Sequence, residues 1–233
     1  MYLPTKKLFT LLAILLPMMT CLTACSNDDD DYNYPSVKLE FLSAQTDVDG
    51  RLIRIISDDG KYMDVSEDVS EQFYQPDTLI RIIANYQQVA GEPQQSGFYA
   101  KLYAWRNILA PQPLAASEFK EGVSHDPVEV VSVWKGYGYI NLILNVREQS
   151  GKHTFHFAEE EVRTDSDGLN IYISLYHKVA ESTQDYDKRV YLSLPYYHYL
   201  TQAAEEGYEG AVNMHLSIET YDKGVLNYSF PVK

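Results

Sequence analysis

The chain has 233 residues and a formal net charge of −14, with 33 acidic side chains against 19 basic ones. Binding to nucleic acid needs clustered Lys and Arg side chains at the phosphates, and a net negative protein repels a polyanion at long range. The composition therefore excludes nucleic acid as a partner. The two cysteines, Cys21 and Cys25, lie close together near the amino terminus, so no disulfide or cysteine metal cage is expected in the rest of the chain.

The amino terminus has the pattern of a secretory signal peptide. Two lysines precede an apolar run, 8–19, which is shorter than the roughly 20 residues of a transmembrane helix. The next segment, Leu22-Thr23-Ala24-Cys25, resembles the lipobox of bacterial lipoproteins. We therefore expect removal of residues 1–24, which takes the net charge to −16, and attachment of a lipid such as palmitate to Cys25. An ordinary signal peptide cleaved near Ala24 is the alternative.

Residues 25–36 are expected to form an acidic tether. Adjacent carboxylates repel each other and extend an unstructured chain, and they lack the alternating ligands and the turn glycine of a calcium loop. The run resembles the export signal with which Bacteroidetes-type bacteria carry lipoproteins to the outer face of the outer membrane, which implies cell-surface localisation. A plain solvated spacer in the periplasm is the alternative. The residues assigned to the signal are Ser26, Asn27, Asp28, Asp29, Asp30 and Asp31.

Residues 37–110 are predicted to form a small OB-like barrel. Short runs of alternating or β-branched residues are separated by the turns Asp47–Gly50 and Asp58–Gly60 and by a glycine- and proline-containing loop. Five short strands in about 75 residues are typical of such a barrel. Three prolines then predict a linker at 111–127, with a weak helix at 117–121. The expected strands are Val37–Phe41, Leu52–Ile56, Lys61–Val65, Thr78–Tyr86 and Phe98–Arg106.

Residues 128–233 are predicted to form an antiparallel β-sandwich, which makes the fold class all-β. Apolar and polar residues alternate along most of this segment, so one face of each strand points into a core. A helix is predicted from Tyr196 to Glu206, ending at Gly207. Burial of each inward aliphatic side chain contributes about 1.5–3 kcal/mol. The expected strands are Val128–Trp134, Tyr139–Val146, Lys152–Phe157, Leu169–Lys178, Val190–Leu194, Val212–Ile218 and Leu226–Val232.

The stretches VVSVWKGYGYINLILNV, LNIYISLYHKV and RVYLSLP, together with the lipobox and the acidic tether, resemble the NigD-like lipoproteins. The resemblance spans nearly the whole chain after the signal peptide and implies an OB-like domain followed by a β-sandwich. It also implies a bacteriocin-associated accessory or immunity role, and it carries no catalytic residue. Lys178 follows His177 where relatives have an asparagine and an acidic turn, so no role is transferred to His177.

Motifs for common catalytic sites are missing from the sequence. It has no G-x-S-x-G elbow, H-E-x-x-H or Walker motif, and three acidic turns, one of them Asp165–Gly168, lack the glutamate of a calcium loop. His153 and His156 fall on opposite faces of a strand, so no shared metal is expected. We predict no catalytic residue, metal or cofactor. A hydrolase that uses a carboxylate pair within Glu159–Glu161 is the alternative.

Tyrosine is unusually frequent, with 20 residues against 8 Phe. Rigid side chains with a polar tip suit recognition surfaces, although β-sandwiches favour tyrosine in any case and another part of the molecule could cover this face. The sequence thus predicts a non-catalytic lipoprotein that binds a partner through its sandwich or the cleft between domains. The partner is a protein toxin or, alternatively, a glycan. The predicted binding tyrosines are Tyr139, Tyr172, Tyr176 and Tyr191.

Overall fold

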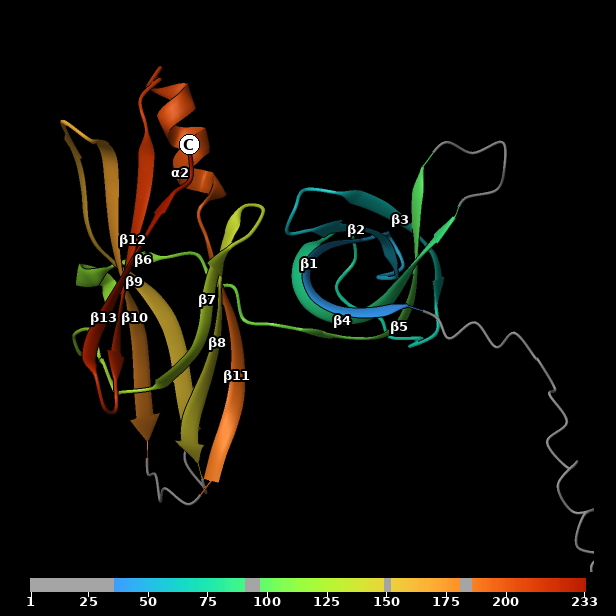
Figure 1. Cartoon of the computed structure of the whole chain (residues 1–233), viewed down its shortest axis with the longest axis horizontal. Helices are drawn as coiled ribbons and strands as arrows, with labels where there is room; N and C mark the ends of the chain where they lie inside the picture. The colour runs from blue at the N-terminus through green and yellow to red at the C-terminus, as the bar shows by residue number, and fades with distance from the viewer. Residues whose placement is uncertain (1–35, 91–96, 149–151, 181–185) are drawn as a thin grey trace, which may run out of the picture. The chain divides into compact units, whose positions relative to one another are not determined.

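The computed structural model describes residues 36–90, 97–148, 152–180 and 186–233 (Figure 1). The expected signal peptide, the expected lipidation site at Cys25 and the expected export signal, Ser26–Asp31, lie outside these residues. No helix in the described part of the chain is long and apolar enough to cross a membrane. Residues 36–233 belong to one compact unit.

The first five strands close into a barrel with the order β1-β2-β3-β5-β4, which confirms the expected five-stranded barrel. The β3–β5 pair is parallel and the other pairs are antiparallel. Alternate residues of each strand point inward, so Leu42, Ile55, Ile82 and Leu102 are fully buried. The bounds of the strands are β1 (Val37–Thr46), β2 (Leu52–Ser57), β3 (Tyr62–Asp68), β4 (Leu79–Ala90) and β5 (Phe98–Asn107).

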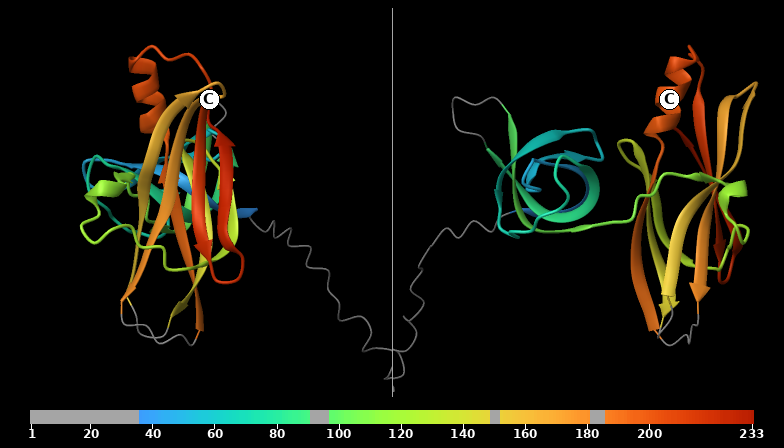
Figure 2. Two further views of the ribbon diagram at one scale, coloured as in Figure 1. Left: turned by 90° about the vertical axis from the view of Figure 1, so that its left-hand side faces the viewer. Right: turned by 180° about the vertical axis from the view of Figure 1, so that it is seen from behind.

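Two sheets form the carboxy-terminal sandwich, and Figure 2 shows them as two layers with a helix at one end. The three-stranded sheet has the order β11-β8-β7 and contains β7 (Glu129–Lys135), β8 (Tyr139–Glu148) and β11 (Tyr186–Pro195). The five-stranded sheet has the order β13-β12-β10-β9-β6 and contains β6 (Leu114–Ala115), β9 (Lys152–Asp165), β10 (Gly168–Ala180), β12 (Val212–Thr220) and β13 (Gly224–Pro231).

The alternation of apolar and polar residues in the sequence correctly predicts which residues form the core of the sandwich. The inward row of β8, which consists of Ile140, Leu142, Leu144 and Val146, is fully buried. It belongs to one apolar cluster with inward residues of β10, β11 and β12 and with two residues of the helix α2 (Tyr197–Glu205). Burial of such rows is the main favourable contribution to the stability of the sandwich.

The sandwich is antiparallel except at two strand pairs. β10–β12 and β6–β9 are parallel. After β10 the chain crosses to β11 in the other sheet, and α2 then returns it to β12 beside β10. Parallel neighbours need such a crossover, which strand periodicity does not reveal.

The segment expected as a linker, 111–127, contributes to the sandwich. Leu114 and Ala115 pair with β9 as β6, and a single 3-10 turn follows at Ala116–Glu118, close to the helix expected at 117–121. Farther along, Asp126 accepts a hydrogen bond of 2.6 Å from the backbone of Val179. These backbone contacts tie the segment to β9 and β10.

The acidic run Glu159–Glu161 lies within strand β9, beyond Phe157, where the sequence pattern had predicted the end of this strand. β9 continues to Asp165, and the register with β10 shifts at this run, which is the signature of a β-bulge. Ser174 donates a hydrogen bond of 2.5 Å to Glu160. The run is therefore part of the sheet, and a cross-strand contact holds the Glu160 carboxylate.

Candidate functional site: a tyrosine-lined cleft between barrel and sandwich

A buried arginine connects the barrel to the sandwich. Arg81 lies in β4 between Ile80 and Ile82, whose side chains fill the barrel core, so its own side chain points out of the barrel. Nevertheless Arg81 is only 3% exposed. It donates to Asn141 Oδ1 at 2.9 Å and to Ser193 Oγ at 3.4 Å, both in the sandwich.

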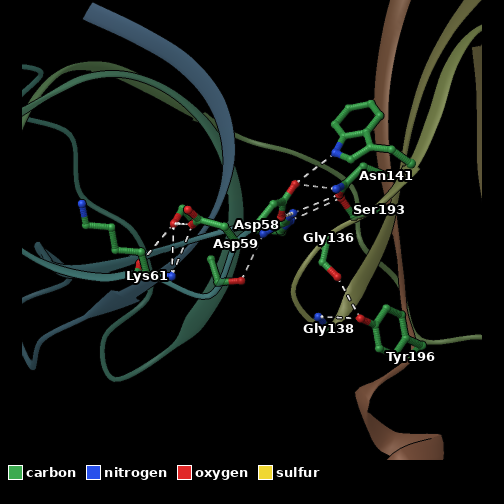
Figure 3. Close-up of polar contacts among 12 residues, drawn as sticks. Asp58, Asp59, Lys61, Gly136, Gly138, Asn141, Ser193 and Tyr196 are labelled. Atoms are coloured by element: carbon green, nitrogen blue, oxygen red, sulfur yellow. Dashed lines mark hydrogen bonds and ion pairs between the residues drawn. The ribbon is translucent and has the colours of Figure 1, made fainter. Parts of the chain in front are cut away.

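The charge of Arg81 is balanced by Asp58, which lies in the β2–β3 turn and forms an ion pair with it (Figure 3). The other oxygen of Asp58 accepts hydrogen bonds from Asn141 at 2.7 Å and from the indole of Trp134 at 3.2 Å. A buried ion is tolerated only when it is paired and its hydrogen bonds are satisfied. Asp58 meets both conditions with groups from barrel and sandwich, so it acts as more than a turn residue.

Gly136 makes this close approach possible. A Cβ atom at residue 136 would lie 2.4 Å from the Asp58 carboxyl carbon, so any larger residue would displace the carboxylate. Tyr196 fixes the same turn, because its hydroxyl donates to the carbonyl of Gly136 at 2.8 Å and accepts from the N–H of Gly138 at 3.2 Å (Figure 3). Burial raises the pKa of Tyr196, which keeps this hydroxyl protonated and able to donate.

An apolar cluster lies beside the polar network. Phe41 meets Trp134 edge-to-face at a centroid distance of 5.0 Å and Tyr191 at 5.8 Å. Ile83 and Ile108 are buried in the same cluster. Aromatic pairs of this kind contribute about 0.5–1.5 kcal/mol beyond the area they bury. Polar and apolar contacts together hold β7, β8 and β11 against the barrel.

A cleft of about 570 Å³ opens between these elements. Its walls come from the barrel, from the β7–β8 turn and from α2, and tyrosines dominate them. Tyr139 forms a cation–π contact with Arg81, whose guanidinium carbon lies 4.4 Å from the ring centroid. A hydrogen bond with Tyr62 raises the pKa of Tyr137, which links a barrel strand to the turn. The four tyrosines are Tyr62, Tyr137, Tyr139 and Tyr197.

Polar groups of α2 complete the lining. Thr201, Gln202 and Glu205 face the cleft together with His198. Nδ1 of His198 is buried and has no hydrogen-bond partner among the described residues. Burial lowers the pKa of His198, so at neutral pH the ring is uncharged. The cleft therefore offers flat aromatic faces, amide and carboxylate groups and an uncharged imidazole, which is a composition suited to recognition.

The tyrosines predicted from the sequence do not form one surface. Tyr139 lines the cleft, and Tyr191 lies in the apolar cluster of the same sheet. Tyr172 and Tyr176 belong to β10 in the other sheet, where they stack on His215 at 4.5 Å and on Phe119 at 4.7 Å, respectively. The structure thus places two of these tyrosines on each sheet of the sandwich.

Sequence reasoning missed most residues of the cleft. Tyr62, Tyr137 and Tyr197 come from three separate segments that only the tertiary fold brings together. Two signals were nevertheless present in the sequence. Arg81 interrupts an otherwise apolar strand, and Tyr137 stands between two glycines in a turn that exposes it.

Histidines elsewhere form pairs and chains, but the described residues include no group of three or more His, Cys, Asp or Glu that could hold a metal ion. His153 Nδ1 lies 2.9 Å from Nε2 of the buried His177. His215 contacts Ser229 Oγ at 2.9 Å and Asn170 Oδ1 at 2.8 Å. A hydroxyl, an imidazole and a side-chain acceptor thus follow one another as they do in the catalytic triad of a hydrolase. None of these residues lines the cleft, and Ser229 lies on the outer strand β13.

Comparisons with known proteins agree with this architecture. A family model described as the NigD-like C-terminal beta sandwich domain matches residues 111–232. A crystal structure of a NigD-like immunity protein from Bacteroides caccae is 29% identical, with a TM-score of 0.70, and the match covers 87% of this chain and 100% of that one. No curated protein matches.

Two further solved structures share the fold at lower identity. A protein provisionally described as toxin-related, from Parabacteroides distasonis, is 17% identical with a TM-score of 0.64, and the match covers 84% of this chain and 93% of that one. A protein provisionally described as a lipoprotein, from Bacteroides fragilis, is 10% identical with a TM-score of 0.55, and the match covers 84% and 96%.

Proposed function

Because the chain belongs to the NigD-like family, we propose that it is a lipid-anchored lipoprotein of the bacterial outer membrane that binds a protein partner without catalysis. Cys25 carries the lipid, and Ser26–Asp31 direct the protein to the cell surface. The partner is a toxin of the bacteriocin class, which the chain neutralises or accompanies. Similarity to a protein described as an immunity protein supports this role.

The tyrosine-lined cleft is the observation that carries the proposal. Tyr62, Tyr137 and Tyr197 are 53%, 47% and 65% exposed, which is high for such large side chains gathered in one place. Tyrosine supplies contact area at a low entropic cost, and a site that is rigid before binding loses less freedom when the partner docks. The Arg81 network provides this rigidity, since it fixes the walls of the cleft to one another.

The chemistry of the cleft suits binding rather than bond making. Its described lining contains one carboxylate, Glu205, and one histidine, His198. A glycosidase needs two carboxylates on either side of the scissile bond, and the three carboxylates of Glu159–Glu161 lie outside the cleft lining. We therefore assign the cleft to recognition.

Photocross-linking in intact cells tests this proposal. A photoreactive amino acid replaces Tyr137 or Tyr197, and a control replaces Phe73, which is 60% exposed on the barrel but outside the cleft. We expect one protein adduct from both cleft positions and none from the control, and we expect Tyr197→Ala to lose toxin protection in a strain that lacks the native gene. Equal adducts at all three positions would contradict the assignment of the cleft.

A glycan is the second candidate for the same cleft. Aromatic faces beside the amides of Gln112 and Gln202 provide stacking and directional hydrogen bonds, which suit a sugar as well as a peptide. A glycan array with the purified protein separates the two candidates. Saturable binding to one polysaccharide that Tyr197→Ala abolishes would favour the glycan, as would the absence of a protein adduct.

The anchor is tested independently of the partner. We expect Cys25→Ser to abolish incorporation of labelled palmitate and to release the protein from the membrane fraction. Replacement of Asp28–Asp31 by alanine should retain the label but remove the protein from protease digestion of intact cells. If Cys25→Ser still partitions with membranes, the lipid-anchor proposal fails, whereas unchanged surface digestion of the alanine variant refutes only the export signal.

A further inference from the structure

One edge of the sandwich has no strand beside it in the described part of the chain. β11 pairs with β8 along its whole length. On its other side the chain makes a single bridge, between Leu109 and Leu192, where the N–H of Ser193 donates to Leu109 at 3.0 Å. At Asp187 and Arg189 this second edge therefore presents main-chain groups with no strand partner among the described residues. Such an edge is a template for another strand.

The bond from Ser193 fixes which groups face outward. Backbone N–H and C=O groups alternate between the two sides of a strand, and the β11–β8 register has no shift. The N–H groups of Tyr191, Arg189 and Asp187 therefore point the same way as that of Ser193, toward the free edge. Asp187 and Arg189 each present a donor beside its own carbonyl acceptor, and this regular spacing matches the pattern of an extended peptide.

A groove of about 530 Å³ runs along this edge, and its charged lining is entirely basic. The basic residues come from three elements, because Arg106 lies in the last two residues of β5, Lys152 begins β9, and Lys188 and Arg189 lie in β11. No carboxylate side chain of the described residues lines the groove. The chain as a whole has a net charge of −14, whereas the lining of this groove carries a net positive charge.

Three of these cations lack a carboxylate partner within the described residues. Lys152 is exposed and forms no ion pair, and Arg106 lies over the ring of Tyr191 at 4.6 Å. Arg189 donates to the side chain of Asn145 at 3.3 Å, and Asn145 in turn binds Glu129. By contrast Arg54, Lys101 and Arg163 elsewhere on the surface each pair with a carboxylate. Lys152, Arg106 and Arg189 are thus available to an incoming anion.

From the free edge and its charge we infer that β11 binds an extended acidic segment of a protein partner by strand addition. The partner's main chain pairs with Asp187 and Arg189, while its carboxylates meet Arg106, Lys152 and Arg189. β-Strand addition draws affinity from main-chain hydrogen bonds and specificity from side-chain contacts. An isolated phosphate would use the cations but could not use the alternating carbonyl acceptors of the edge, so a peptide fits the surface better.

This inference does not rest on the tyrosine cleft. The groove shares no lining residue with it, so a failure of either assignment leaves the other intact. A partner could also engage both surfaces, in which case the two sets of substitutions would weaken binding independently.

The test uses the protein without its lipid and a fluorescent eight-residue peptide of alternating aspartate and valine. A lysine–valine peptide of the same length and inorganic phosphate are the comparison ligands. We expect saturable anisotropy changes with the acidic peptide only, together with slower hydrogen exchange of the β11 amides. The double variant Arg106→Gln/Arg189→Gln should bind about 10-fold more weakly, and added salt should weaken the wild-type complex.

Asp187 provides a matched pair of variants that separates strand addition from simple attraction of charge. Asp187→Ala and Asp187→Pro both remove one carboxylate, but only proline removes the outward N–H, at an edge position where proline is tolerated. Strand addition predicts that the proline variant binds the acidic peptide several-fold more weakly than the alanine variant, with unchanged thermal midpoints. Equal affinities, binding of the lysine peptide, or binding of phosphate without the peptide would overturn the inference.

Discussion

Arg81 of the barrel and Asn141 of the sandwich form a hydrogen bond of 2.9 Å, and both residues are almost inaccessible to solvent. Asn141 lies on the outward phase of β8, which the sequence pattern would leave in water. The barrel covers Asn141, and the Asn141 amide oxygen accepts a hydrogen bond from the Arg81 guanidinium. Without such partners from the sandwich, the cost of burying this charge would not be offset. This pair therefore couples the packing of the two β modules to a single electrostatic network.

Removal of the buried cation should destabilise the protein. Arg81→Met leaves Asp58 as an uncompensated carboxylate beside Asn141, and breaking a buried pair in this way costs about 3–5 kcal/mol. Because the side chain of Asp58 is 22% exposed, partial solvation should reduce the loss to about 2–4 kcal/mol. Urea unfolding followed by circular dichroism measures it.

The matched control is Arg54→Met. Arg54 pairs with Asp64 at 2.8 Å, but both side chains are about half exposed, so the expected loss is under about 1 kcal/mol. Similar losses for the two arginines would show that burial between the barrel and the sandwich adds nothing to the Arg81 pair.

A methyl group added at residue 136 should disrupt the hydrogen bonds of Asp58, the anionic partner of Arg81. In Gly136→Ala the new Cβ would fall 2.4 Å from the carboxyl carbon of Asp58, so Asp58 must move and lose its bonds to Trp134 and Asn141. We expect a loss of about 1–3 kcal/mol and a change in tryptophan fluorescence. Gly97→Ala is the control, because its Cβ would make only ordinary contacts, at 3.6 Å or more. An unchanged emission spectrum in the residue-136 variant would argue against the contact.

Periodicity predicted much of this fold because strand faces are a local property. The row Ile140, Leu142, Leu144 and Val146 alternates in the sequence and is buried in the structure. Periodicity shows which face a residue occupies, but it cannot show what covers that face. For this reason the pattern did not reveal that the barrel covers Asn141 or that β10 has a parallel neighbour.

The candidate site was predictable only in fragments. Tyr139 was expected at a binding surface and lines the cleft, but Tyr62 and Tyr197 are far from it in the sequence. Their approach depends on the Arg81 network, which joins groups separated by up to 112 positions. A single sequence carries no direct signal for such contacts, since each partner alone has the appearance of an ordinary turn or strand residue.

Stability should fall as the solution becomes mildly acidic. Burial lowers the pKa of His177, and the neighbouring His153 adds to the effect. Burial also lowers the pKa of His198 and His215. The folded state then binds these protons less readily than the unfolded chain, whose histidines titrate near about 6.5. The contribution to stability is present above about pH 6.5 and is lost as the pH falls from there toward the lowered pKa values of the folded state.

Urea unfolding at intervals between about pH 7.5 and 5.5 measures this dependence. We expect His177→Gln to flatten the slope, whatever its effect on stability at the highest pH, because it removes one of the groups that takes up a proton on unfolding. A slope identical to that of the wild type would show that His177 does not contribute to it.

The contact between Tyr199 and Glu159 makes a final prediction about the acidic run of β9. The hydroxyl of Tyr199 donates to Glu159, and burial together with this bond raises the pKa of Tyr199. Tyr199→Phe removes the donor and leaves a partly buried carboxylate, which should cost about 1–3 kcal/mol in urea unfolding. Glu161→Gln, at an exposed side chain, should change stability by less than about 0.5 kcal/mol. If instead the two substitutions have equal effects, Glu159 is as well solvated as its neighbour and the ordering of the run by α2 is refuted.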